Sequence, residues 1–587
     1  EFDYGTRVRP DPIAGYVGNT LVNTLHRLEA VRVKAAGNFV RKYIVDYENN
    51  VNDPLNTSRI ESIGLCFDEA ENDCVTEAAF AWSTIDSASV IAQNFTHFKI
   101  PTTDITGDLN GDGLADIIRK NTTVGVQVAL GNGDGTFGSY QTWATPAELN
   151  TLANGAYESY ETKIIDMDGD GRDDLFVTVM APVGYHLHFR GTYILYSTGS
   201  GFDTAEAWLS DAGLSNTAFR CTFAELNGDG LPDCAEYQSG GYLELVKRYA
   251  LNKGRGATPT IASWANSLPN LGTSIVFDVN GDDLNDIVHN VGGTHQMRLN
   301  QGAGNAFSAP QSLPSEHGIL YVSYRFYVDV NGDGLDDLVF IEPDPYKVKV
   351  AINTGKGFLA SETWFDASNG NGYVFGSENY SSKLLDVNAD GKVDLVSSGG
   401  SGGVVVCLST GVSPSQGGAQ TGFLPETAWI NTTSTWDSHS IFSDLDGNGL
   451  PDFKHTLTAP TTSTPVYLNP SSLHHIEGFV DGYGRSITVD YRTLALSNGA
   501  YNQGDGLILN QNNTIIDVDG DVKRVAKAQY IVAEYDISNG LGSDTNTHRY
   551  QYTNLLRHLS GWGSLGFEKI ERETVIGGTV VNKEIFE

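Results

Sequence analysis

Basic side chains are scarce in this chain of 587 residues. It carries 37 Lys and Arg against 72 Asp and Glu, which gives a formal net charge of -35 at pH 7. Nucleic-acid backbones and anionic membrane surfaces have the same sign of charge and would repel such a protein. The composition therefore argues against nucleic acid as a partner.

Long apolar runs are also missing. The longest stretches are short ones such as Gly403 to Leu408, far below the roughly 18 residues of a membrane-spanning helix, so we expect no direct membrane insertion. The chain begins Glu-Phe-Asp, without Met or an apolar leader, which suggests a processed product or a fragment. Its 40% hydrophobic content, with 8 Trp, 27 Tyr and 25 Phe, is typical of a globular protein rather than a disordered acidic one. At roughly 100 to 200 residues per domain, we expect three or four domains, or one large domain with appendages.

Cysteine is rare, and no C-x-x-C pair occurs among the five residues Cys66, Cys74, Cys221, Cys234 and Cys407. This excludes the common zinc ribbons and thioredoxin-like motifs. The first two cysteines flank a short acidic turn, and the next two flank an acidic loop between strand-like runs. Each pair either bridges a hairpin in an oxidising compartment or remains two buried thiols. Cys407 lies in an apolar run and is expected to be buried and free.

The most prominent feature of the sequence is a nine-residue pattern, Asp-x-Asn/Asp-x-Asp-x-x-x-Asp, that recurs seven times. The copies begin at residues 108, 166, 225, 278, 329, 386 and 444, so successive copies start 51 to 59 residues apart. This is the length of a four-stranded propeller blade with its turns.

The rest of each period is strand-like. A short apolar run such as Leu338-Val-Phe-Ile follows each acidic loop, and an alternating run ending in a Gly turn, such as Val348-Lys-Val-Ala-Ile-Asn-Thr-Gly, comes 15 to 25 residues later. Helical patterns are nearly absent, and the best candidate is Pro146 to Leu152. Because no repeat can bury its own faces, the sequence predicts an all-β chain in which seven blades close into a ring.

The acidic loops have the residue types of a calcium site. Side-chain oxygens at positions 1, 3, 5 and 9, a backbone carbonyl at position 7 and a Gly at position 4 or 6 match the oxygen-rich shell that calcium prefers. We predict a calcium loop in each blade, up to seven ions in all. The predicted ligands are Asp108, Asn110, Asp112, Leu114, Asp116, Asp166, Asp168, Asp170, Arg172, Asp174, Glu225, Asn227, Asp229, Leu231, Asp233, Asp278, Asn280, Asp282, Leu284, Asp286, Asp329, Asn331, Asp333, Leu335, Asp337, Asp386, Asn388, Asp390, Lys392, Asp394, Asp444, Asp446, Asn448, Leu450 and Asp452.

The alternative is that the Asp-Gly and Asn-Gly pairs only mark hairpin turns. Seven copies with intact spacing argue against it, because crowded carboxylates repel one another unless a cation lies between them. Three copies depart from the pattern: Glu225 replaces the first Asp, Asp283 replaces the Gly at position 6, and Asn448 replaces the Asp at position 5. The third, fourth and seventh sites are therefore expected to be weaker.

The loops resemble the FG-GAP and VCBS repeats of integrin-alpha-type propellers. The resemblance covers residues 86–470 and retains the Phe-Gly signature in part, as in Gly135-Thr-Phe137-Gly. It implies a seven-bladed β-propeller with a calcium loop in each blade.

The flanking segments resemble a narrower family. Residues 476–493, the motif Arg549-Tyr-Gln-Tyr552 and the motif Gly561-Trp-Gly-Ser-Leu-Gly-Phe567 are similar to the region after the propeller in the B component of insecticidal toxin complexes, virulence-plasmid B proteins and other RHS-repeat proteins. Trp562 and Ser564 depart from the family's pattern. Residues 40–47, 58–66 and 80–82 look like the strands that lead into the same family's propeller.

Motifs of catalysis are absent from the sequence. There is no H-E-x-x-H, no G-x-S-x-G and no Walker loop, since Gly355-Lys356 is followed by Gly. Gly133 to Gly138 fits G-x-G-x-x-G, but a hairpin turn explains it better. His474, His475 and Glu477 lie together in a linker and are poor candidates for metal binding or acid-base chemistry. We expect no enzymatic activity in this chain, and any catalytic toxin domain would lie outside it.

These observations predict three parts: a strand-rich, β-sandwich-like entry segment (1–85), the propeller (86–470) and the start of an RHS-like β domain (471–587). The resemblance implies a calcium-stabilised recognition and scaffold region of a bacterial secreted toxin or surface protein, with a toxin subunit or host receptor as protein partner. The alternative is an adhesin or lectin-like propeller that binds host protein or glycan. A propeller enzyme such as a lyase or glycosidase is a third hypothesis, because paired carboxylates could hide among so many acids. The expected location is secreted or at the bacterial cell surface.

Overall fold

The computed structural model describes residues 1–6, 9, 11, 13–17, 20–48, 57–83, 89–93, 104–121, 124–152, 159–183, 186–210, 220–239, 243–263, 274–291, 294–302, 307–313, 325–343, 346–366, 382–398, 403–416, 421–430, 441–454, 464–469, 475–494, 501–502, 522–524, 529–538, 545–558 and 563–586. His474, Trp562 and the predicted part boundaries at residues 85 and 86 and at 470 and 471 lie outside these ranges.

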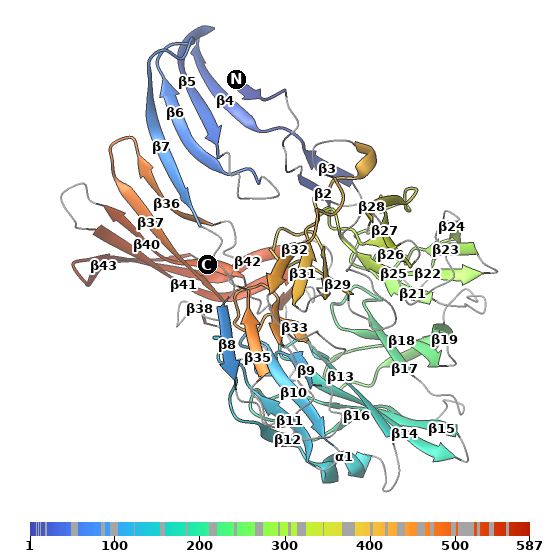
Figure 1. Ribbon diagram of the computed structural model, residues 1–587. Helices are drawn as coiled ribbons and strands as arrows, with labels where there is room; N and C mark the ends of the chain where they lie inside the picture. Colours follow the sequence, from blue (N-terminus) through green and yellow to red (C-terminus); the bar gives the residue numbers. More distant parts are fainter. Residues whose placement is uncertain are drawn as a thin grey trace.

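Seven four-stranded antiparallel sheets form the blades of a β-propeller, which confirms the predicted all-β, seven-bladed fold (Figure 1). The first six blades each consist of four consecutive strands. Their bounds are β9 (Asp104–Gly107), β10 (Asp116–Asn121), β11 (Gly125–Ala129) and β12 (Gln141–Ala144); β13 (Ser159–Ile165), β14 (Asp174–Val183), β15 (His186–Leu195) and β16 (Glu206–Ser210); β17 (Arg220–Ala224), β18 (Asp233–Ser239), β19 (Leu243–Leu251) and β20 (Thr260–Ser263); β21 (Ser274–Phe277), β22 (Asp286–Val291), β23 (Thr294–Arg298) and β24 (Gln311–Ser312); β25 (Arg325–Val328), β26 (Asp337–Pro343), β27 (Tyr346–Ala351) and β28 (Glu362–Asp366); β29 (Ser382–Leu385), β30 (Asp394–Ser398), β31 (Val404–Cys407) and β32 (Thr427–Ile430).

The seventh blade is completed by a strand from before the first blade. It contains β33 (Ile441–Ser443), β34 (Asp452–Lys454), β35 (Thr464–Leu468) and β8 (Ser89–Gln93), and Val466 of β35 pairs with Ile91 of β8. This pairing closes the ring and removes the sheet edge that an open array of blades would expose.

Apolar side chains from neighbouring blades form the core between them. Val126 and Val128 of β11, for example, belong to one buried cluster with Leu175 and Val177 of β14. Burying an aliphatic side chain stabilises the fold by roughly 1.5 to 3 kcal/mol. Each blade therefore depends on its neighbours for stability, as the strand-rich repeats predicted.

The two flanking segments share one thirteen-stranded sheet outside the propeller (Figure 1). The entry strand β7 pairs with β36, which follows the propeller, and the rings of Phe80 and Phe479 lie 5.8 Å apart across this pair. The sequence suggested two separate parts at this point, and the structure joins them. The strands, in sheet order, are β1 (Phe2–Tyr4), β4 (Leu28–Ala35), β5 (Asn38–Tyr47), β6 (Ile60–Cys66), β7 (Cys74–Trp82), β36 (Ile476–Asp481), β37 (Ser486–Thr493), β40 (Tyr530–Ser538), β41 (Thr545–His558), β42 (Gly563–Ile576) and β43 (Thr579–Phe586), with β38 (Tyr501–Asn502) and β39 (Val522–Arg524) paired to β41.

Three smaller elements complete the described chain. A two-stranded sheet contains β2 (Ile13–Val17) and β3 (Thr20–Thr24), and Pro414–Gln416 form a short 3-10 helix. The predicted helix is present as α1 (Pro146–Leu152), and Thr145 and Glu148 cap its N-terminus with reciprocal hydrogen bonds. Among the described residues, no helix has the length and apolar character needed to cross a membrane.

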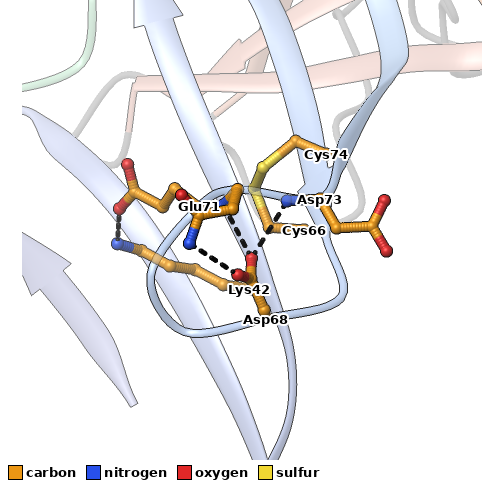
Figure 2. Close-up of a disulfide and its surroundings, with 7 residues drawn as sticks. Lys42, Cys66, Asp68, Glu71, Asp73 and Cys74 are labelled. Atoms are coloured by element: carbon orange, nitrogen blue, oxygen red, sulfur yellow. Dashed lines mark hydrogen bonds and ion pairs between the residues drawn. A yellow bond between two sulfur atoms is a disulfide. The ribbon is translucent and has the colours of Figure 1, made fainter.

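Both candidate cysteine pairs form disulfides, and Cys407 is buried and free as expected. Figure 2 shows the Cys66–Cys74 bridge at the end of the β6–β7 hairpin. Within the turn, the Asp68 carboxylate accepts the backbone N–H groups of Asn72 and Asp73, and Lys42 reaches across from β5 to Glu71. Disulfides form and persist in oxidising environments.

Candidate metal loops

Each acidic loop connects the first and second strands of its blade. In the first blade, Asp108 directly follows β9, and Asp116 is the first residue of β10. The Asp at position 9 begins the second strand in all seven blades, at Asp116, Asp174, Asp233, Asp286, Asp337, Asp394 and Asp452. The sequence pattern therefore corresponds to one structural position repeated around the ring.

The carboxylate at position 9 organises the backbone of its blade. All seven are at most 1% exposed. In the fifth blade, Asp337 accepts the N–H of Val330 at position 2 and the N–H of Asn353 in the turn after the third strand, at 3.2 and 2.7 Å. The same pair of hydrogen bonds recurs in the other six blades. Position 9 thus ties each loop to the turn beside it.

The carboxylates at positions 1 and 5 fold the loop around itself. In the fifth loop, Asp329 accepts the N–H groups of Gly332 and Gly334, and Asp333 accepts the N–H of Leu335 at 3.0 Å. The bond from the position 6 amide to the position 1 side chain is present in all seven loops, as is the bond from the position 7 amide to the position 5 side chain. The side-chain oxygens of each loop are therefore directed toward its interior.

Positions 4 and 6 require a left-handed backbone. Gly332 and Gly334 have φ values of 75° and 86°, which glycine adopts without steric cost. Two copies place other residues there, with φ of 54° at Ala389 and 65° at Asp283. The Gly pattern that the sequence showed is thus a conformational requirement, and these two loops store strain.

Three carboxylates meet closely in two of the loops. Asp166, Asp168 and Asp174 each offer an oxygen within 4.8 Å of the others, and so do Asp444, Asp446 and Asp452. Position 3 is Asp in these two loops and Asn in the other five. The second loop combines four carboxylates, because Asp170 occupies position 5.

Burial and mutual repulsion raise the pKa values of these groups. Burial, together with the charge of the neighbouring Asp168, raises the pKa of Asp174 to about 9. Burial likewise raises the pKa of Asp108 to about 7 and of Asp233 to about 8. A divalent cation would supply the charge that these carboxylates lack, so the donor set fits calcium.

Two loops contain a basic side chain of their own. Arg172 at position 7 of the second loop bonds Asp170, and Lys392 at the same position of the sixth loop bonds Asp390 at 2.9 Å. The sequence assigned both residues as carbonyl donors only. Their side chains would compete with a bound cation for the carboxylate at position 5.

The turn after the third strand contains functional residues that the sequence analysis did not single out. Its first residue is Ser or Asn in six blades, and its backbone N–H binds the carboxylate at position 9. In five of these six blades, the sequence motif Ser/Asn-x-Gly after the third strand, as in Asn353-Thr-Gly355, could have identified this residue.

The first and seventh loops lie beside each other where the ring closes. Asp108 of the first loop and Asp444 of the seventh line a cavity of about 450 Å³, together with Thr106, Leu114 and Ser443. Because every acidic loop joins the first and second strands of its blade, the seven loops lie on one face of the propeller.

Residues 108–177 match the FG-GAP-like repeat family, which covers the first two loops. A solved structure of the Photorhabdus luminescens Tc holotoxin pore is similar to the chain at 13% identity and a TM-score of 0.58, covering 97% of this chain and 23% of that one. This chain thus shares its fold with about a quarter of a much longer protein.

Other solved structures align more weakly. The complex of TcdB2, TccC3 and Cdc42 covers 98% of this chain and 25% of its own at 14% identity and a TM-score of 0.42. A lectin from Agrocybe aegerita, described as recognising non-reducing terminal N-acetylglucosamine, covers 67% of this chain and 98% of its own at 18% identity and a TM-score of 0.45. No curated protein matches the sequence.

Proposed function

We propose that this chain is the recognition and scaffold region of a secreted bacterial toxin or surface protein of the toxin-complex type, and that its propeller docks a partner protein. The proposal rests on the single sheet that joins the segments before and after the propeller, together with the similarity in fold between 97% of this chain and part of the Tc holotoxin pore. A closed ring with loops on one face is a rigid platform for recognition.

Calcium is the second part of the proposal. The side chains at loop positions 1, 3, 5 and 9, with the carbonyl at position 7, would hold up to seven ions. The raised pKa of the buried position 9 carboxylates supports this role, since a bound cation would offset their burial and mutual repulsion. The ion would supply charge and crosslinking rather than chemistry.

The absence of catalytic motifs from the sequence supports a non-enzymatic role. The paired carboxylates of the loops are committed to backbone N–H groups, as Asp337 is to those of Val330 and Asn353. A general acid or base needs a carboxyl that can reach substrate, and the seven carboxylates at position 9 are at most 1% exposed.

Direct association with a partner tests the proposal. The full chain, with and without Asp333→Ala, is mixed in calcium buffer with a pore-forming toxin-complex subunit, and binding is measured by biolayer interferometry. We expect saturable binding that weakens together with thermal stability in Asp333→Ala. Binding to a glycan array with no binding to the subunit would instead favour a lectin-like propeller, and turnover of a polysaccharide would favour an enzyme.

A further inference from the structure

Side chains from one blade reach the acidic loop of the preceding blade at six of the seven seams. In each case the first residue of the turn after the third strand donates its side-chain hydrogen to the backbone carbonyl at loop position 2. We call these six residues the clamp residues. The pairs are Ser197 to Leu109, Asn252 to Met167, Asn300 to Leu226, Asn353 to Val279, Ser409 to Val330 and Asn469 to Val387.

The seventh seam has no clamp. Gly131 occupies the equivalent position in the first blade, and glycine has no side chain that could reach Leu445 of the seventh loop. A Cβ at this position would lie 2.7 Å from the carbonyl oxygen of Ala115, so the local backbone excludes a clamp residue. The cavity between Asp108 and Asp444 lies at this same seam.

A second link strengthens alternate seams. The backbone N–H at loop position 8 donates to the carbonyl at position 1 of the preceding loop, from Asp173 to Asp108, from Asn285 to Glu225 and from Val393 to Asp329. Loops one and two, three and four, and five and six are therefore doubly linked pairs. Among the residues that the structure describes, no such backbone bond involves the seventh loop.

The clamp helps to fix the backbone of a residue that lies between two predicted calcium ligands. In the fourth loop, the N–H of Val279 donates to Asp286 at 2.9 Å, while its carbonyl accepts from Asn353 at 2.8 Å. Asp278 and Asn280, at positions 1 and 3, flank this residue on either side. Holding both ends of Val279 restricts the orientation of both flanking side chains.

We propose that the six clamp residues are positioning residues for the acidic loops, coupling each loop to the next blade, and that the unclamped seventh loop is the first to open and the weakest to bind a cation. The coupling itself needs no ion. Its effect on calcium rests on the calcium role proposed above.

Site-resolved amide hydrogen exchange of the full chain in chelator tests the coupling without calcium. The amide at loop position 2 is bonded to the position 9 carboxylate in all seven loops, so it reports the opening of each loop. In the unmodified protein we expect the Leu445 amide to exchange faster than its six equivalents. Exchange at Leu445 equal to or slower than the others would overturn the proposal, even if no variant folds.

Variants at Asn353 remove a single clamp, together with the bonds of the same side chain to the Asp336 carbonyl and the Gly355 amide. Asn353→Ala leaves the buried Val279 carbonyl unpaired, and we expect the Val279 amide to exchange roughly tenfold faster. Asn353→Ser should restore protection, because Ser197 and Ser409 act as clamps in other blades. Thr354→Ala is the matched control, since it removes a side-chain bond of the same turn that stays within the turn. An unchanged Val279 amide in Asn353→Ala, or equal acceleration in Thr354→Ala, would contradict the clamp.

A calcium titration followed by the same amides separates this proposal from the calcium role. We expect Leu445 to need the highest calcium concentration for protection, and Asn353→Ala to raise the midpoint at Val279 but not at Met167. If calcium protects none of the seven amides, the calcium role fails while the exchange result in chelator still decides the clamp. Equal midpoints at all seven loops would overturn the predicted order of affinity.

Discussion

At the residue scale, the sequence predicted the spacing of the acidic side chains but not the different structural role of each position. Position 9 appeared equivalent to positions 1, 3 and 5, whereas in the structure Asp337 joins a loop amide to the amide of Asn353 in another turn. The contact between Asp337 and Asn353 depends on which strands are neighbours, and a repeat pattern does not contain that information. The side chains of Arg172 and Lys392 were missed for a different reason, because position 7 was assigned only as a backbone carbonyl.

Relief of backbone strain gives a prediction at this scale. Ala389 takes a left-handed φ of 54° at a position where each of the other six loops has glycine, with φ between 73° and 81°. We expect Ala389→Gly to raise the free energy of unfolding by about 0.5 to 1 kcal/mol, as measured by urea denaturation. Ala309→Gly, at an exposed position without a left-handed φ, should lower it slightly. Destabilisation by Ala389→Gly would show that the loop is unstrained.

His289 gives a second prediction, on pH. It is completely buried on β22, and burial, with the nearby Arg298, lowers its pKa to about 4. Because the unfolded chain takes up this proton near pH 6.5 and the folded one only near pH 4, the stability contributed by the neutral ring is lost as the pH falls through this window. We expect unfolding measured in urea at pH 7 and pH 5 to show about 2 kcal/mol less acid destabilisation in His289→Leu than in the unmodified chain. Val288→Ala, on the same strand but without a titratable group, should leave the difference between the two pH values as it is.

At the scale of elements, local patterns predicted strands and the one helix well. Residues 40–47 and 486–491 lie in β5 and β37, and Pro146–Leu152 forms α1. The pairing of β7 with β36 was not predicted, because alternation shows which face of a strand is apolar but not which strand lies beside it. The pairing of β8 with β35 in the seventh blade was not predicted, for the same reason.

The Cys221–Cys234 bridge supports a prediction for one blade. It joins β17 to β18 at the two ends of the third loop, and Cys234 directly follows the position 9 residue Asp233. We expect Cys221→Ala with Cys234→Ala to cost about 2 to 4 kcal/mol in thermal unfolding and to weaken calcium binding at the third loop. The paired alanine substitutions at Cys66 and Cys74 are the control, since that hairpin lies in the flanking sheet. Equal loss of calcium binding in both double variants would rule out a local effect of the bridge.

At the scale of the whole molecule, the repeat length predicted the number of blades, and the net charge of -35 indicates how they are held together. Part of the acidic excess lies in the seven loops on one face. Backbone hydrogen bonds join three pairs of neighbouring loops, and loops one and seven line a common cavity. A ring built in this way has its strongest repulsion where its blades meet. Cations bound at that face would therefore stabilise the ring as a unit, rather than single loops.

Removal of calcium should consequently destabilise the entire propeller. If free calcium exceeds the dissociation constant of each site by about 1- to 10-fold, binding contributes roughly 0.4 to 1.4 kcal/mol per site, or about 3 to 10 kcal/mol for seven sites. This is comparable with the stability of an ordinary domain. We expect a lower melting temperature in excess chelator, restored fully by calcium and only partly by magnesium, because magnesium demands a smaller and more regular shell. The loops at 329 and 108, which keep Gly at position 6, should lose order last and the unclamped loop at 444 first. Identical melting curves in chelator and in millimolar calcium would show that the seven loops are ordinary turns and that calcium has no part in the stability of the ring.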